Sequence, residues 1–152
     1  MVVNKEGMDL IKSYEKLRLK AYLCPAGVAT IGYGATFYPS GKKVRLGESI
    51  TAMQAEKLFS FHVDKFDKGL KSLLKVELND NQYSALLSFA YNAGLGNLSK
   101  STLLKKVNIN PNDLSIRAEF MRWNKSNGKI LNGLIARRGE EANLYFKPII
   151  ES

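Results

Sequence analysis

Apolar residues recur at the spacing of an α-helix through most of this chain, and one segment, residues 21–46, breaks that pattern. The pattern is densest at residues 83–91, where apolar side chains stand at positions i, i+3, i+4, i+7 and i+8. Such a stripe predicts a buried helix, so we expect residues 83–91 to lie in the central helix. The interrupted segment contains Pro-Ala-Gly and Pro-Ser-Gly turn signals and the short run 28–33, which is typical of a small antiparallel sheet.

These patterns predict an α+β fold with two lobes. We expect a small β-hairpin lobe at about residues 15–60, and a larger helical lobe at about residues 61–152 together with the first helix. A chain of 152 residues suits a single domain with one core, so we assign residues 1–152 to one domain. The chain then crosses twice between the lobes, and a cleft between lobes is where ligand sites usually form. The sheet is expected to have two or three strands, the third at residues 43–46.

Local signals predict where helices begin and end. We expect helix starts at Asn4, at Thr51, at Asn79 or Asp80, at Ser101 or Thr102, at Asn110-Pro111 and at Asn132. A break in the helix that follows Thr51 is expected near Gly69, because glycine weakens a helix interior. Gly94 and Gly96 are expected to end the central helix.

The chain is strongly basic, with a net charge of +9. A basic surface attracts anionic polymers and membranes, but the basic clusters here, residues 42–45 and 105–106, are short and typical of a solvated surface. We therefore expect no nucleic-acid partner. With one cysteine the chain forms no internal disulfide, which fits synthesis in a reducing cytoplasm. We find no signal-peptide pattern and no apolar run of membrane-spanning length, and we expect no membrane anchor.

Two charged residues interrupt apolar stripes, Glu15 on the first helix and Arg138 on the last. Partial burial raises the pKa of a carboxyl group, and a raised pKa keeps Glu15 protonated near neutral pH, as a general acid requires. The structural alternative is a buried glutamate that pairs with Arg137 or Arg138, and an arginine in that place would also orient the acid. The sequence leaves open which of the two arginines pairs with Glu15.

The sequence offers few residues for other kinds of binding site or catalysis. The chain has no phosphate-binding glycine loop, and with one histidine and one cysteine it has no His/Cys zinc set, so we expect neither a cofactor nor a metal. His62 lies on an apolar stripe with Phe59 and Phe66 and suits a core position. Cys24 and Thr30 flank a predicted hairpin turn, where a thiol and a hydroxyl on one side would hold one water, although each residue also suits an ordinary structural role.

Residues 15–36, EKLRLKAYLCPAGVATIGYGAT, resemble the active-site segment of the tailed-phage lysozymes, the glycoside hydrolase family (family 24) that includes phage endolysins. That family's signature is Glu, eight residues, Asp or Cys, five residues, Thr, and Glu15, Cys24 and Thr30 fit it without a gap. Residues 85–108 resemble the family's central helix, and residues 122–145 resemble its segment with Trp, Gly-Leu and Arg-Arg-x-x-Glu, in the same order.

The resemblance implies a lysozyme-like fold with the substrate across the cleft, and hydrolysis of the β-1,4 bond between N-acetylmuramic acid and N-acetylglucosamine. It implies that Glu15 is the general acid, and that Cys24 and Thr30 position the attacking water in an inverting reaction. Four residues match positions that line the family's cleft and are expected to contact sugar: Tyr33, Tyr91, Asn92 and Ser101.

The chain departs from the common pattern of this family at two positions. Cys24 takes the less common option, and an ordinary thiol with a pKa near ~8.5 is a poor base at neutral pH. Either the surroundings lower the pKa of Cys24, which we favour, or Cys24 attacks the sugar directly and the reaction retains configuration. Ala35 stands where many relatives carry histidine, so any role of that histidine is absent here.

We therefore expect a monomeric endolysin, or a prophage copy of one, that is made in the host cytoplasm and reaches peptidoglycan through a holin-like pore. The nearest alternative is a lytic transglycosylase that uses Glu15 and leaves an anhydro sugar. A Cys24/His62 cell-wall peptidase is a more distant one, since it needs the two residues in contact and a helix after Cys24. A glycan-binding protein without turnover is the non-enzymatic alternative.

Overall fold

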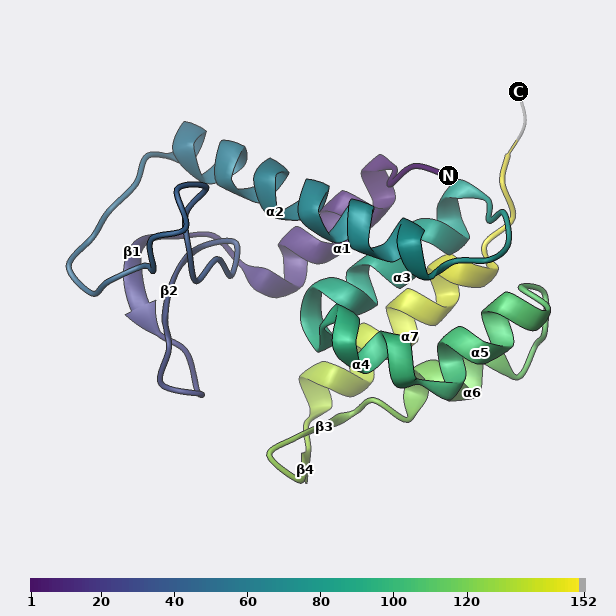
Figure 1. Cartoon of the computed structure of the whole chain (residues 1–152). Coiled ribbons are helices and arrows are strands. Elements are labelled where there is room, and N and C mark those ends of the chain that lie inside the picture. Colours follow the sequence, from purple (N-terminus) through teal and green to yellow (C-terminus); the bar gives the residue numbers. More distant parts are fainter. Residues whose placement is uncertain (151–152) are drawn as a thin grey trace. The chain divides into compact units, whose positions relative to one another are not determined.

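The computed structural model describes residues 1–150 and has an α+β architecture, as predicted (Figure 1). The elements in chain order are α1 (Lys5–Glu15), β1 (Arg18–Leu23), β2 (Ala29–Gly32), α2 (Ala52–Leu73), α3 (Asp80–Ala93), α4 (Leu95–Lys100), α5 (Thr102–Ile109), α6 (Ile116–Met121), β3 (Lys125–Ser126), β4 (Lys129–Ile130) and α7 (Asn132–Phe146). Among the residues described, no helix combines the length and the apolar character needed to cross a membrane.

The chain divides into two compact units. Met1–Ile11 with Phe66–Ser152 form the first, called here the helical unit, and Lys12–Lys65 form the second, called the hairpin unit. Both α1 and α2 contribute residues to each unit.

The centre of the helical unit is α3, which is buried along most of its length and packs against α7 (Figure 1). Asn79 begins α3 with a capping box, in which its side chain accepts from the backbone N–H of Gln82 and the Gln82 side chain accepts from that of Asn79. Phe89 of α3 meets Phe120 and Trp123 edge to face, with ring centroids 6.0 and 5.5 Å apart. The predicted central helix is therefore confirmed.

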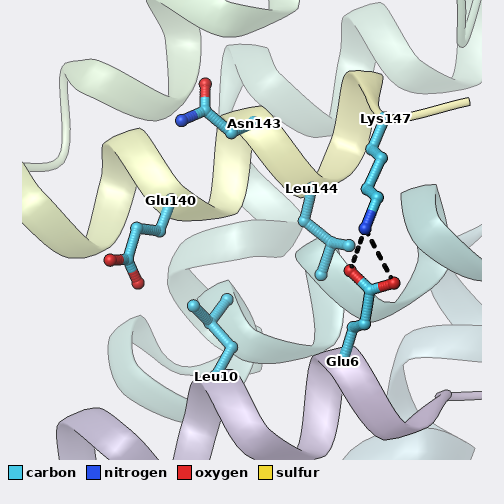
Figure 2. Close-up of a pocket in the computed structure, with 6 residues that line it drawn as sticks. All are labelled: Glu6, Leu10, Glu140, Asn143, Leu144 and Lys147. Carbon is cyan, nitrogen blue, oxygen red and sulfur yellow. Dashed lines mark hydrogen bonds and ion pairs between the residues drawn. The ribbon is translucent and has the colours of Figure 1, made fainter.

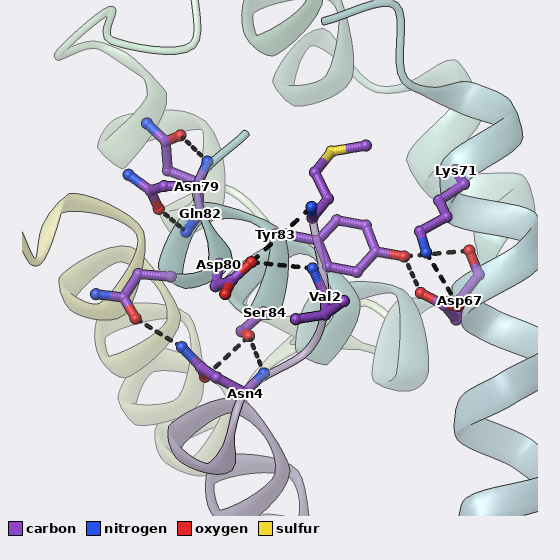
Figure 3. Close-up of polar contacts among 11 residues, drawn as sticks. Val2, Asn4, Asp67, Lys71, Asn79, Asp80, Gln82, Tyr83 and Ser84 are labelled. Atoms are coloured by element: carbon purple, nitrogen blue, oxygen red, sulfur yellow. Dashed lines mark hydrogen bonds and ion pairs between the residues drawn. The ribbon is translucent and has the colours of Figure 1, made fainter. Parts of the chain in front are cut away.

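The N-terminal residues are fixed to α3 by polar contacts (Figure 3). The Asn4 side chain caps α1 by accepting from the N–H of Gly7 at 3.0 Å, and its amide donates to Asn81 at 2.8 Å. A Cβ on Gly7 would stand 2.5 Å from Cβ of Ser84, so glycine permits the close approach of α1 to α3. The predicted cap at Asn4 is confirmed.

Helix α2 is tied to α3 inside the helical unit by Tyr83, Asp67 and Lys71 (Figure 3). The fully buried Tyr83 donates its hydroxyl to the carboxylate of Asp67, which also pairs with Lys71 at 3.5 Å. Burial raises the pKa of Tyr83, so its hydroxyl stays a donor.

The predicted break at Gly69 is wrong, because α2 runs unbroken from Ala52 to Leu73. Gly69 instead makes room for Leu95, whose side chain would overlap a Cβ at that position. Gly94 ends α3 as predicted, but Gly96 lies inside α4.

The predicted helix start at Asn110-Pro111 is also wrong. The Asn110 side chain accepts from the N–H of Asn112 at 3.0 Å, and the carboxylate of Asp113 accepts from the N–H of Ser115 at 2.9 Å. These side chains stabilise two successive turns in place of a helix, and α6 begins only at Ile116.

A hairpin that the sequence reasoning missed joins β3 to β4. Its two turn residues, Asn127 and Gly128, have φ values of 51° and 77°. An Asn-Gly pair with positive φ at both positions is the commonest signal for a two-residue hairpin turn, so the signal was present in the sequence.

In the hairpin unit, β1 and β2 pair in antiparallel fashion, with Tyr22 opposite Thr30. The sheet has two strands, the lower of the two predicted numbers, because residues 43–46 make only a single bridge, from Lys43 to Phe37. The N–H of Val44 donates to the carbonyl of Thr36 at 2.9 Å, so the stretch pairs with the loop that follows β2. The side chain of Val44 enters a small core that also contains Ile31, Ala35 and Leu58.

Candidate functional site

Glu15 is the last residue of α1, and its carboxyl group lies against the backbone of Gly34. Lys16 takes a left-handed conformation, with φ of 57°, which ends the helix directly after Glu15. A Cβ on Gly34 would stand 2.5 Å from Oε1 of Glu15, and Gly34 itself has φ of +86°. Both the close approach and the backbone conformation require glycine at position 34.

Cys24 and Thr30 lie together at the hairpin between β1 and β2. The N–H of Cys24 donates to the carbonyl of Val28 at 3.0 Å, and the hydroxyl of the buried Thr30 donates to the same carbonyl at 2.9 Å. The half-buried thiol of Cys24 therefore lies near the Thr30 hydroxyl. The predicted proximity of these two residues is therefore confirmed.

The turn also changes the acidity of the Cys24 thiol. The backbone amide of Val28 lowers the pKa of Cys24 most strongly, with further lowering by the amide of Ala26 and the hydroxyl of Thr30, while desolvation acts in the opposite direction. Hydrogen bonds to a charged form favour that form, so these groups stabilise a thiolate. The direction of the pKa shift is the one that our favoured hypothesis for Cys24 requires.

A second cluster in the hairpin unit surrounds Tyr33. The ammonium group of Lys12 lies 2.8 and 2.9 Å from the two carboxylate oxygens of Glu56, and it stands 5.4 Å from the ring centre of Tyr33 and 5.3 Å from that of Phe59. The Tyr33 hydroxyl donates to Glu56 at 3.5 Å, and the two rings pack with centroids 5.2 Å apart. This cluster fixes Tyr33, the residue before Gly34.

Lys12 and Glu56 were not among the residues that the sequence singled out. Lys12 lies three residues before Glu15 on α1, and residues at that spacing share one helix face. Lys12 therefore attaches the last turn of α1, which presents Glu15, to the first turns of α2 within the hairpin unit. The helical spacing to Glu15 was the available signal, but the partner Glu56 is 44 residues away in the sequence.

In the helical unit, Arg137 and Arg138 surround the fully buried Glu141. Nε of Arg137 lies 3.2 Å from Oε2 of Glu141, and Nε of Arg138 lies 2.9 Å from its Oε1. Burial raises the pKa of Glu141, whereas the two guanidinium groups and the hydroxyl of Ser88 act to lower it. Arg138 also donates to the side-chain oxygen of Asn92 at 2.7 Å. The pairing of either arginine with Glu15 stays a prediction.

Two further predicted sugar contacts lie in the helical unit. Tyr91 packs on Phe66, with ring centroids 5.2 Å apart, and is partly exposed. Ser101 is buried and caps α5, since its hydroxyl accepts from the N–H of Leu104 at 3.0 Å and donates to the carbonyl of Leu98 at 2.7 Å. The geometry thus assigns Ser101 a capping role, and its contact with substrate stays a prediction.

His62 is a core histidine, as the sequence predicted. It is buried, its Nε2 lies 3.0 Å from the carbonyl oxygen of Phe37, and its ring meets Phe37 and Phe61 edge to face. Desolvation lowers the pKa of His62, and the charge of Lys65 lowers it further. Cys24 is followed by a turn and by β2, which is not the helix that a cysteine peptidase would need.

A cavity of about 410 Å³ lies between α1 and α7 in the helical unit, and none of the predicted site residues lines it (Figure 2). Glu6 at its rim pairs with Lys147 at 2.8 Å, and Leu10 and Leu144 line its apolar part. Within residues 1–150, no three His, Cys, Asp or Glu side chains are grouped as metal ligands.

Residues 12–141 match the family model described as Phage lysozyme. The endolysin of Bacillus phage B103 is 44% identical over 147 residues, which cover 95% of this chain and 54% of that protein. The endolysin of Acyrthosiphon pisum secondary endosymbiont phage 1 is 43% identical over 150 residues, covering 95% of this chain and 98% of that protein. The solved endolysin from Escherichia coli O157:H7 phage FAHEc1 superposes with a TM-score of 0.88 at 36% identity, covering 100% of this chain and 98% of that one. The chain thus spans about half the length of the Bacillus phage relative.

Proposed function

Because the chain belongs to the phage lysozyme family, we propose that it is a muramidase that hydrolyses the β-1,4 bond between N-acetylmuramic acid and N-acetylglucosamine in bacterial peptidoglycan. The endolysin relatives support the reaction class. The observation that carries the residue assignment is the position of the Glu15 carboxyl against Gly34, in the unit that also holds the Cys24–Thr30 pair.

In this proposal Glu15 is the general acid. Its proton passes to the glycosidic oxygen while the bond from that oxygen to C1 of the muramic acid breaks. Contact with the Gly34 backbone restricts the carboxyl group to few conformations, so little ordering is needed when the substrate binds.

The attacking water is proposed to bind at Cys24 and Thr30. The Cys24 thiolate accepts one proton from the water while the water oxygen bonds to C1 on the face opposite the leaving group. The Thr30 hydroxyl orients the water, and the anomeric configuration is inverted. In the second hypothesis, the sulfur itself bonds to C1, and later hydrolysis of that thioglycoside gives retention. The anomeric configuration of the first product distinguishes these two pathways.

Sugar binding is proposed for Tyr33 and Tyr91, whose ring faces suit pyranose rings, and for the amide of Asn92. The Lys12–Glu56 pair supports Tyr33, and the guanidinium group of Arg138 holds the side-chain oxygen of Asn92. This proposal keeps Arg137 and Arg138 as orienting residues for Glu15, and Ser101 as a substrate contact.

A lytic transglycosylase is the second candidate, and the thiol at position 24 supports it. A transglycosylase needs one acid and no water-activating carboxylate, because the C6 hydroxyl of the muramic acid attacks its own C1. The product is then an anhydro sugar.

The deciding experiment digests purified peptidoglycan with the wild-type protein and with Glu15→Gln, and analyses the soluble products by mass spectrometry. Hydrated reducing muropeptides from the wild type alone support the muramidase. Anhydro muropeptides would make the chain a transglycosylase, and binding without any product would leave only a glycan-binding protein. Free peptides from both proteins would assign Glu15 a structural role.

We also propose that the protein is a monomer made in the host cytoplasm, and that it reaches the wall through a holin-like pore. Size-exclusion chromatography with light scattering tests the first point. Lysis timing in cells that express the chain with and without a holin tests the second.

A further inference from the structure

The hairpin unit carries a cavity of about 670 Å³ on the loop between β2 and α2. Its lining consists of Tyr38, Lys42, Lys43, Val44, Arg45 and Glu48. Three of these six side chains are cationic, and none of the predicted site residues is among them. The volume lies within the range of small-molecule sites.

The loop that forms this cavity is fixed by its backbone. The N–H of Tyr38 donates to the carbonyl of Lys42 at 2.9 Å, and the N–H of Gly41 donates to the carbonyl of Tyr38 at 2.8 Å. Val44 is buried in the core of the hairpin unit, whereas its neighbours Lys43 and Arg45 are exposed. The cationic side chains therefore stand on an ordered scaffold.

The one carboxylate in the lining already has partners. Glu48 accepts from the Tyr38 hydroxyl at 2.9 Å and from the N–H of Arg45 at 2.8 Å, and these hydrogen bonds lower its pKa. Desolvation and the carboxylate together raise the pKa of Tyr38 to about 12, so the hydroxyl stays a donor. The charge of Arg45 also lowers the pKa of Glu48, but the three cations of the lining outnumber this one carboxylate, so the cavity carries a net positive charge.

We propose that this cavity binds the phosphodiester groups of an anionic polymer attached to the bacterial cell wall. A guanidinium group matches two phosphate oxygens at once, and lysines add point charges, whereas a neutral glycan offers no charge to complement the three cations. The choice of a wall polymer among polyanions rests on the proposed function, because the same unit carries Glu15, Cys24 and Thr30.

A second cavity of the hairpin unit adjoins the first. It has a volume of about 410 Å³, and Lys43 and Val44 line it as well as the first cavity. It extends to Val28 and Ala29, which directly precede Thr30. A polymer held at the basic cavity would therefore keep this unit next to the glycan to which the polymer is attached.

The test measures binding of isolated poly(glycerol phosphate), a probe without a cleavable glycan, by calorimetry at near-physiological salt. The site variant is Lys42→Gln/Lys43→Gln/Arg45→Gln. The matched control is Lys75→Gln/Lys100→Gln with Lys105→Gln, which removes the same charge from exposed lysines of the helical unit. We expect the site variant to lose at least about tenfold in affinity and the control to lose less than about threefold, because local contacts outweigh net charge at this salt.

Equal losses in the two variants would overturn the proposal in favour of general electrostatics, as would absence of binding by the wild type. Competition tests the choice of polymer. That choice would be overturned if vesicles with 30% phosphatidylglycerol, or a DNA duplex, displaced the polymer at equal phosphate concentration. Turnover of a soluble uncharged glycan oligomer is measured in parallel. A wild type that binds polymer but does not cut glycan refutes the proposed function, and the binding site stands.

Discussion

Replacement of Gly34 by alanine tests whether the contact between Glu15 and the Gly34 backbone positions the acid. The new Cβ would stand 2.5 Å from Oε1 of Glu15, whereas ordinary contacts begin at 3.4 Å. The carboxyl group must therefore shift by about 1 Å, and a shift of that size in a reacting group costs about 100-fold in rate. We expect Gly34→Ala to lower kcat about 100-fold with little change in KM.

The substitution also affects folding, and this effect must be separated from the loss of rate. Gly34 has φ of +86°, a conformation that costs an alanine about 1–2 kcal/mol. For a chain of this size, each kcal/mol lowers Tm by about 2–4 °C. A folded population therefore persists at assay temperature, and kcat is determined on protein whose folded fraction has been measured by circular dichroism.

Gly128→Ala is the matched control, because Gly128 has φ of +77° and a Cβ there meets no atom within 4 Å. It carries the same kind of backbone strain without contact to a carboxyl group. We expect it to lower Tm as much as Gly34→Ala and to leave kcat within about twofold of wild type. If Gly34→Ala retained wild-type kcat, or if both variants lost kcat equally, the inferred role of this contact would be refuted.

Three further predictions concern the same residues and their supports. Because the backbone amides lower the pKa of Cys24, its reaction with iodoacetamide should have a pH midpoint below that of the urea-unfolded chain, and complete modification should abolish turnover. A midpoint at or above that of the unfolded chain, or full activity after modification, would contradict this. Lys12→Met should lower kcat about tenfold and leave most of the chain folded at the assay temperature. Lys12→Arg should keep most of the wild-type kcat, because arginine can still pair with Glu56. A wild-type kcat in Lys12→Met would argue against a positioning role. Glu141→Gln should destabilise the chain by about 3–5 kcal/mol in urea unfolding, because it leaves two buried guanidinium groups without their carboxylate, and a loss below about 1 kcal/mol would show that they find other partners.

The sequence was sufficient to predict the helices and their first residues where these depend on local periodicity and capping. Asn4, Thr51 and Asn79 were predicted as helix starts because their side chains bond backbone groups three residues away. The proximity of Cys24 and Thr30 followed from the turn between them, and the order of the three site residues followed from the family resemblance.

Other features depended on distant residues and were not predictable in this way. Gly69 looked like a helix break because propensity describes an isolated helix, whereas the packing of Leu95 against α2 is what requires glycine there. The predicted helix start at Asn110-Pro111 was wrong because side-chain hydrogen bonds within the following turns compete with a helix. The pair of Lys12 with Glu56 joins two helices, and no local pattern contains it.

The thiol at position 24 changes how much each of the proposed site residues, Glu15, Cys24 and Thr30, would contribute to the reaction rate. A carboxylate there would be ionised without help, whereas this thiol depends on the turn, whose amides at Val28 and Ala26 stabilise the anion. The same hydrogen bonds that populate the thiolate also make it a weaker base, since a lower pKa means a weaker hold on the proton. In the proposed mechanism, the thiolate therefore helps the water less than its abundance suggests, and more of the rate would come from proton donation by Glu15 and from the orientation of water by Thr30. If Glu15 is the acid as proposed, its close contact with Gly34 would matter more beside this thiol than beside a carboxylate, and attack by the C6 hydroxyl would stay chemically close to attack by water.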